Sequence, residues 1–187
     1  MQIINFYMCM LQERDDVLFA KYARRRPSYY FNSFFVDKLL QNGAYCYSNV
    51  KRWTRKIDVF SMDKVFFPVN IANTHWALAV VWVSRKQIRY FDSMSGAGKG
   101  YVEGLRRWLA EERKERKGEV LSLEDWTCGS MRGIPQQQNG FDCGVFATVC
   151  ADFLSDDLPL EYSQGNMEEF RQKIGAAIIR GSLNYPI

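Results

Sequence analysis

The chain has 187 residues, of which 47% are hydrophobic and 25% are charged, and its formal net charge is +4. This composition excludes a disordered or fibrous protein, and a chain of this length buries about 70% of its unfolded surface on folding, which is enough for one core. The longest strongly apolar run, residues 76–83, is too short to cross a bilayer, and the first residues lack the pattern of a signal peptide. We therefore expect a single soluble domain spanning residues 1–187.

The cysteines and the basic clusters indicate the cellular location of the protein and the kind of partner it could bind. Five scattered cysteines with no C-x-x-C pair argue against a disulfide framework and against a zinc site. Reduced thiols fit a nuclear or cytoplasmic location, and we expect no metal. Basic residues gather at 24–26, 51–56 and 113–117. We interpret these clusters mainly as solvated faces, with an acidic partner as the alternative.

The first 40 residues carry helical and aromatic patterns. Apolar residues at a spacing of three and four over residues 3–11 predict a helix that begins almost at the first residue. Residues 24–27, three arginines and a proline, are expected to break the chain. Residues 29–40 are predicted to be a helix or an extended segment with aromatic anchors. Aromatic and basic residues together would also suit a nucleic-acid surface, but no nucleic-acid-binding fold is recognisable, so core packing is favoured.

A local sheet is predicted next. Residues 65–71, 76–83 and 87–91 are rich in β-branched and aromatic residues and predict three antiparallel strands. Pro68 in the first of them indicates an edge strand or a bulge. The glycine-rich loop at residues 93–100 lacks the Gly-Lys-Ser/Thr ending of a phosphate-binding loop, so we do not interpret it as a nucleotide site.

Two further helices are expected around the remaining loops. Residues 101–117 form an amphipathic pattern with basic residues in the last turns, and Gly118 suits the C-cap. Residues 167–183 are predicted to form a terminal helix. No composition shift divides the chain into two domains.

A cysteine lies where a turn-rich loop meets an apolar helical pattern. Residues 133–142 carry the turn-forming residues, and from Gly144 apolar residues recur at the spacing of a buried helix. Cys143 is therefore expected at a helix N-terminus, where backbone N–H groups and the helix dipole favour the thiolate. Asp142 suits the N-cap. We interpret Cys143 as a nucleophile, although a buried cysteine at a helix start is often inert.

A thiol nucleophile needs a base and a group that orients the base. The only histidine in the chain, His75, starts the second predicted strand, and Asp92 follows the third. Adjacent antiparallel strands place the start of one beside the end of the next, so His75 and Asp92 are expected to meet. Gln137 could return its amide beside the sulfur and form an oxyanion hole with the Cys143 N–H. Each residue alone has an ordinary structural explanation, whereas the combination favours nucleophilic catalysis.

Several segments resemble the signature blocks of the Ulp/SENP family of SUMO-specific (sentrin-specific) cysteine proteases, which remove SUMO from conjugates and trim its precursor. These segments are residues 4–8, 50–60, 73–76, 90–93 and 134–144, so the resemblance covers nearly the whole chain. It implies an α+β, papain-like fold with a central, mostly antiparallel sheet packed against helices and the nucleophile at a helix N-terminus.

The resemblance also implies a reaction and its catalytic residues. The roles are Cys143 as nucleophile, His75 as general base, Asp92 as the group that orients it, and Gln137 as oxyanion donor. The implied reaction is cleavage after the C-terminal Gly-Gly of SUMO through a thioester, as isopeptidase and as precursor-processing endopeptidase, without a cofactor. The expected partner is SUMO or a SUMO conjugate. We expect a monomer with no nucleic-acid and no membrane partner.

Three residues are candidates for binding the substrate. Trp76 matches the family tryptophan that covers the Gly-Gly tail, in a narrow slot that admits glycine because glycine has no side chain. Thr74 beside it and Arg52, in a basic segment that could face an acidic modifier surface, are the other two. In the family a second tryptophan lies shortly before the block at residues 4–8, so we expect that residues upstream of Met1 have been removed.

Three other functions stay open at this point. One is a protease for another ubiquitin-like protein such as NEDD8, since the catalytic motifs do not name the modifier. Another is a modifier-binding module without turnover. The third is acyl transfer by the same thiol.

Overall fold

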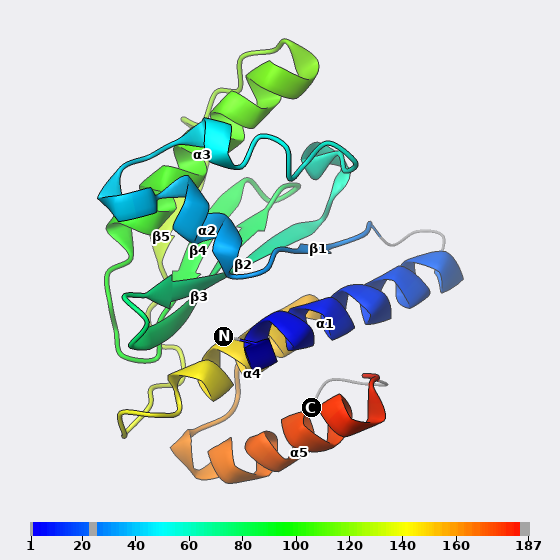
Figure 1. The fold of residues 1–187 in the computed structure, drawn as a ribbon, viewed down its shortest axis with the longest axis vertical. Helices are drawn as coiled ribbons and strands as arrows, with labels where there is room; N and C mark the ends of the chain where they lie inside the picture. Colours follow the sequence, from blue (N-terminus) through cyan, green and yellow to red (C-terminus); the bar gives the residue numbers. More distant parts are fainter. Residues whose placement is uncertain (1, 23–25, 184–187) are drawn as a thin grey trace.

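The computed structural model describes residues 2–22 and 26–183 (Figure 1). Five helices and five strands make up its main elements, joined by loops with four short 3-10 helices. In chain order they are α1 (Gln2–Lys21), β1 (Tyr29–Tyr30), α2 (Phe34–Leu39), η1 (Gln41–Gly43), η2 (Tyr47–Asn49), η3 (Val59–Ser61), β2 (Lys64–Ile71), β3 (His75–Trp82), β4 (Gln87–Phe91), α3 (Lys99–Lys117), β5 (Thr127–Ser130), α4 (Cys143–Ser155), η4 (Gln164–Asn166) and α5 (Met167–Arg180).

The strands form one sheet in the order β1-β2-β3-β4-β5. Its centre, β2-β3-β4, is antiparallel, as the sequence predicted, with Ile71 opposite His75 and Leu78 opposite Phe91. The short edge strands β1 and β5 pair in parallel with their neighbours. The sheet is therefore mixed, with most of its paired residues in the antiparallel part.

Helices cover both faces of this sheet (Figure 1). Helices α1, α4 and α5 pack on one face with Leu78 and Val80 of β3, whereas α2 and α3 pack on the other with Ala77 and Ala79. Alternate residues of β3 thus enter opposite cores, as the period of a strand requires. Helix α4 lies between β3 and helices α1 and α5, and ten of its 13 residues are buried. This burial fixes the position of its first turn.

The predicted helices are confirmed, with adjusted ends. Helix α1 continues from the predicted residues 3–11 to Lys21. The break predicted at residues 24–27 falls partly on residues 23–25, which lie outside the described residues. Residues 29–40 adopt both of the predicted states, strand β1 followed by helix α2. Helix α5 stops at Arg180 because Gly181 takes a left-handed conformation and closes the helix with its N–H, a glycine C-cap.

The prediction of an edge strand or a bulge at Pro68 is wrong. Strand β2 is not an edge strand of the sheet, because β1 lies beside it. The described pairing of β1 with β2, however, reaches only Val65 and Phe66. Pro68 lies beyond that pairing while it stays in register with Leu78 of β3. The missing N–H of proline is tolerated because this stretch of β2 has a strand on one side only within the described residues.

The described residues hold neither a membrane-crossing helix nor a metal-binding cluster. Among residues 2–22 and 26–183, no helix has the length and apolar character needed to cross a membrane. The same residues contain no group of three or more His, Cys, Asp or Glu side chains placed to hold a metal ion.

Candidate active site

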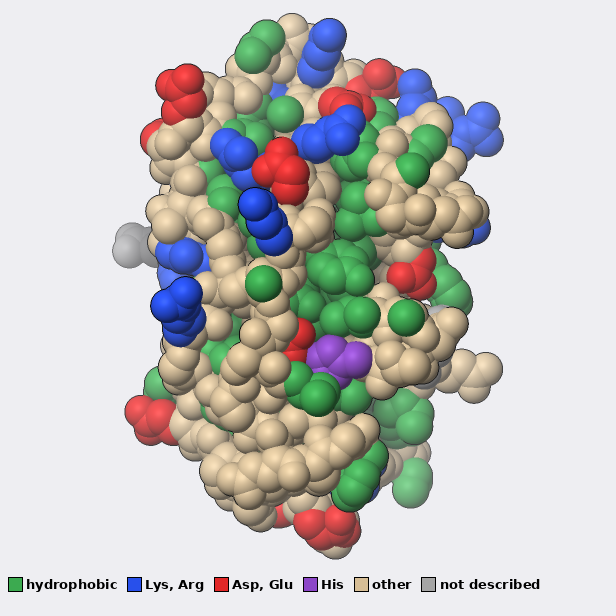
Figure 2. Space-filling view, turned by 90° about the vertical axis from the view of Figure 1, so that its left-hand side faces the viewer, with side chains coloured by type: hydrophobic (Ala, Val, Ile, Leu, Met, Phe, Trp, Pro, Cys, Tyr) green, Lys and Arg blue, Asp and Glu red, His purple; other side chains and the backbone are tan. Residues whose placement is uncertain are grey.

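The histidine and the aspartate meet as predicted. His75 is the first residue of β3, after a tight turn in which Ala72 and Asn73 have positive φ, and Asp92 directly follows β4. His75 Nε2 lies 2.7 Å from Asp92 Oδ1. Figure 2 shows the histidine side chain at the surface with an acidic side chain beside it. Because Nε2 faces the carboxylate, Nδ1 is the ring nitrogen left to exchange a proton with a nucleophile.

Asp92 is held in place by more than the imidazole. Its carboxylate is 5% exposed and also accepts hydrogen bonds from Met94 N at 2.8 Å and from the Tyr90 hydroxyl at 3.3 Å. Burial and the neighbouring carboxylate raise the pKa of Tyr90 above its ordinary value, so its hydroxyl keeps its proton and donates. These donors hold the Asp92 carboxylate in the position from which it orients the imidazole.

The glycine-rich loop has a steric role beside this carboxylate. A Cβ added to Gly96 would lie 2.3 Å from Asp92 Oδ2. The φ angle of Gly96 is not positive, so its backbone would accept alanine. The glycine therefore provides the space that the Asp92 carboxylate occupies, which no local sequence signal could show.

We expect Gly96→Ala to lower turnover by about tenfold to 100-fold, because the methyl group displaces Asp92 from His75 and a small misplacement of a catalytic group is costly. The measurement is the turnover number on a modifier conjugate. The matched control is Gly100→Ala, since an added Cβ there meets no atom within 4 Å. Equal activity of the two variants would contradict a role for this space.

Cys143 is the first residue of helix α4, as predicted, and the residue is 6% exposed. Its chain neighbour Gly144 lies against Trp76, the residue after the histidine: a Cβ added to Gly144 would lie 3.7 Å from Trp76 Cδ1 and 3.5 Å from Ile4 Cδ1. The residue after Cys143 thus packs against the residue after His75. The N-terminus of α4 is where a thiolate is favoured.

The role expected of Asp142 is wrong in one respect. It occupies the N-cap position, but its side chain makes no capping hydrogen bond, because its backbone is in the α region rather than the extended conformation of a capping residue. The Asp142 side chain, 6% exposed, instead accepts hydrogen bonds from Asn139 at 2.7 Å, from Gln164 at 2.6 Å and from Arg171. Burial alone would raise the pKa of this carboxyl group, but these partners outweigh burial, so the pKa lies below its usual value.

The Gln137 amide is half-buried and fixed, not a free loop amide in solvent. Ser93 Oγ donates to its Oε1 at 2.6 Å, and its Nε2 donates to Asn139 O at 2.5 Å. The Gln137 N–H also bonds to Ser93 O at 2.9 Å. The bond to Asn139 uses one of the two hydrogens of Nε2, so the second is available to a substrate oxygen. Ser93, which the sequence analysis missed, sets which end of the amide is the donor; its position directly after Asp92 was the available signal.

We expect Gln137→Ala to lower turnover by about 10²- to 10³-fold with little change in substrate affinity, the effect of losing one oxyanion donor. Turnover and affinity are measured separately on the same modifier substrate. The control is Gln138→Ala, which changes an exposed amide on the same loop. Weaker binding with unchanged turnover would place Gln137 in the binding surface instead.

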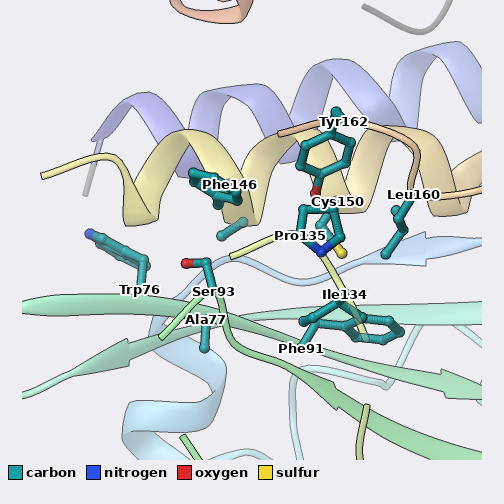
Figure 3. Close-up of a pocket in the computed structure, with 11 residues that line it drawn as sticks. Trp76, Ala77, Phe91, Ser93, Ile134, Pro135, Phe146, Cys150, Leu160 and Tyr162 are labelled. Atoms are coloured by element: carbon teal, nitrogen blue, oxygen red, sulfur yellow. The ribbon is translucent and has the colours of Figure 1, made fainter. Parts of the chain in front are cut away.

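The candidate substrate-binding residues are distributed unevenly. Trp76 is half-buried beside the first turns of α4 and lines a small pocket of about 10 Å³, which holds at most one water (Figure 3). Thr74 is exposed in the turn before His75, where its hydroxyl donates to Ile71 O at 3.1 Å.

Arg52 is exposed and lies on the other side of the sheet. Its segment is held by α3, because Arg116 of that helix donates to Lys51 O and Thr54 Oγ1. Helix α3 covers the opposite face of the sheet from α4. The structure therefore groups Trp76 and Thr74, but not Arg52, with His75.

Fold and site together define a class of protein. A thiol at a helix N-terminus, an imidazole bonded to a carboxylate on an adjoining sheet, and a fixed amide on the loop before the thiol are the parts of a papain-like cysteine peptidase. Comparison with known proteins then gives the family. The chain belongs to the Ulp1 protease family: residues 1–183 match the description "Ulp1 protease family, C-terminal catalytic domain".

Relatives and solved structures agree with this family. Human sentrin-specific protease 2 is 36% identical over 184 residues, which cover 97% of this chain and 30% of the human protein. A sentrin-specific protease of Caenorhabditis elegans is 34% identical over 182 residues, 97% of this chain and 25% of that protein. The chain thus spans less than a third of these relatives. The C-terminal Ulp1 protease domain solved in complex with Smt3, the yeast ortholog of SUMO, matches with a TM-score of 0.78 and 28% identity, covering 96% of this chain and 75% of that one. The expected fold and family are confirmed.

Proposed function

We propose that this chain is the catalytic part of a SUMO-specific thiol protease that cleaves after the C-terminal Gly-Gly of SUMO, both in conjugates and in the precursor. The observation that carries the proposal is the 2.7 Å bond from Asp92 to His75, the first residue of the strand β3 that packs against the helix begun by Cys143. The names of the relatives and the Ulp1–Smt3 complex support SUMO as the modifier.

The proposed reaction assigns one role to each of these groups. The Cys143 sulfur attacks the glycine carbonyl while His75 holds the thiol proton at Nδ1. The oxyanion that forms accepts hydrogen bonds from the Gln137 amide and the Cys143 N–H. The C–N bond then breaks as the imidazolium passes its proton to the leaving amine, from lysine in a conjugate and from the backbone in the precursor, which leaves a thioester. Water, deprotonated by His75, attacks the thioester carbonyl. The C–S bond then breaks, which releases the glycine carboxylate and returns the Cys143 sulfur, and Asp92 stabilises the imidazolium in both halves.

Trp76 is proposed to select for glycine at the scissile bond. Its position beside Gly144, one residue after the nucleophile, supports contact with the last residues of an extended tail. A tail that must lie against this ring has no room for side chains, so selection is steric. Thr74 is proposed to line the same path. Arg52, on the α3 side, would contact the body of the modifier rather than its tail. The expected tryptophan upstream of Met1 lies outside the described residues and stays a prediction.

The cellular location and the oligomeric state of the protein are also proposals. We place the protein in the nucleus or cytoplasm, as a monomer acting on SUMO conjugates. All five cysteines are free, which supports a reducing compartment.

The test is a panel of electrophile probes that carry a Gly-Gly terminus on SUMO paralogues, NEDD8 and ubiquitin. We expect a covalent adduct at Cys143 with the SUMO probes, seen by intact mass, and turnover of the matching fluorogenic SUMO substrate. A Cys143→Ala protein is the control. Labelling by NEDD8 alone would replace SUMO by another modifier. Tight binding with neither adduct nor turnover would instead identify a binding module, and acetyl transfer from a CoA donor an acyltransferase.

A further inference from the structure

The loop that carries Gln137 and ends at Cys143 is fastened by side chains from the C-terminal part of the chain. Gln164 in η4 and Arg171 in α5 both reach this loop. Neither residue was a candidate from the sequence, because each lies more than 20 positions after Cys143 in a segment with no chemical motif.

Gln164 spans the loop from one side to the other. Its Oε1 accepts the backbone N–H of Gln138 at 2.8 Å, and its Nε2 donates to Asp142 Oδ2 at 2.6 Å. Gln164 is itself positioned by η4, in which Ser163 and Asn166 form a capping box. Both ends of one amide thus fix the distance between the two ends of the loop.

Arg171 compensates a buried charge. Asp142 is 4% exposed, lies directly before the nucleophile and is ionised at neutral pH, while the Arg171 side chain is 48% exposed. An uncompensated carboxylate at this place would oppose formation of the Cys143 thiolate. His75 and Asp92 come from the sheet, whereas α5 contributes a cation, Arg171.

Asn139 connects this carboxylate to the oxyanion donor. Its Nδ2 donates to Asp142 Oδ2 at 2.7 Å, and its Oδ1 accepts the N–H groups of Phe141 and Asp142 at 3.1 and 3.0 Å. Its backbone oxygen accepts from Gln137 Nε2 at 2.5 Å. A continuous set of hydrogen bonds therefore runs from Arg171 through Asp142 and Asn139 to the Gln137 amide.

We propose that Gln164 and Arg171 are positioning residues for the reaction proposed above. Both hold Asp142 in place and, through Asn139, position the Gln137 amide. Arg171 also compensates the Asp142 charge next to Cys143. Helix α5 contributes no catalytic residue, yet turnover depends on its docking. The inference rests on the proposed function for its turnover readout but not for its chemical readout, which needs no modifier.

The test compares Gln164→Glu, Arg171→Met and Arg171→Lys with the control Lys173→Met. The control removes a similarly exposed ion pair, to Glu169 at 2.8 Å, from the same helix. We expect Gln164→Glu and Arg171→Met to lower kcat by about tenfold to 100-fold with KM changed less than about threefold, because positioning acts on the transition state. Arg171→Lys keeps the charge and should recover part of kcat, and Lys173→Met should behave as wild type.

Alkylation by iodoacetamide separates this inference from the identity of the modifier. The rate at Cys143 is followed by peptide mass spectrometry, with the exposed Cys9 as internal standard. We expect Arg171→Met to slow Cys143 relative to Cys9 by about fivefold or more, because the Asp142 charge disfavours the thiolate. Adding Asp142→Asn should restore the rate, because the opposing charge is gone.

Two results would overturn the inference. One is a fall in the thermal midpoint with kcat and Cys143 alkylation both unchanged, which would make the contacts purely structural. The other is an equal loss of kcat in Lys173→Met, which would make the effect general to α5. If no modifier is turned over by the wild-type protein, the proposed function fails, while the alkylation rates still decide on Arg171.

Discussion

Replacing Cys143 with serine is expected to abolish hydrolysis, by about 10³-fold or more, while modifier binding is retained. The helix N-terminus favours a thiolate at this position, whereas an alcohol there keeps its proton and is a far poorer nucleophile. Turnover of a fluorogenic modifier substrate and its affinity by calorimetry are the two measurements. Cys9→Ser, an exposed cysteine on α1, is the control.

The second cysteine of α4 cannot replace the first. Cys150 is buried between the helix and the sheet, and burial raises the pKa of its thiol well above the usual range, despite a hydrogen bond from Tyr162. It stays protonated at neutral pH. A Cys143→Ser protein that keeps more than a few per cent of wild-type turnover would therefore sink the assignment of the nucleophile altogether.

The loss of the imidazole is expected to be nearly as severe. His75→Ala removes the only histidine in the chain, so no neighbouring residue can take the thiol proton and return it to the leaving amine, and we expect a fall in turnover of about 10³-fold or more. The measurement is turnover at pH 7, with and without added imidazole. Partial rescue by imidazole is expected, because the base then enters the space left by the side chain.

A matched control lies two residues away. Asn73→Gly removes an exposed side chain from the same turn, where the positive φ of Asn73 suits glycine, and leaves the histidine in place. Its turnover should stay within about threefold of wild type, because Asn73 holds no proton in the reaction. Wild-type activity of His75→Ala at pH 7 would mean that the base is elsewhere.

The sequence by itself determined the local placement of the reactive groups. The change from a turn-rich loop to an apolar helical period predicts that Cys143 opens a helix, and α4 begins there. Two short connections between three apolar strands leave only an antiparallel register, which brings the start of β3 beside the end of β4. His75 and Asp92 meet for that reason. Both predictions depend only on elements that follow one another along the chain, and the periodicity of the sequence identifies such elements directly.

Only the tertiary structure decided how these groups are held. Ser93 orients the Gln137 amide, and Gly96 leaves the space for Asp92, through contacts between separate loops. Asp142 turns from the predicted cap to Arg171 because α5 packs beside α4. Such contacts form between segments distant in sequence, and their geometry depends on how helices and sheet pack. A linear pattern carries no record of that packing, so the residues that bear the chemistry could be predicted, whereas Gly96, Gln164 and Arg171, which act on them from distant segments, could not.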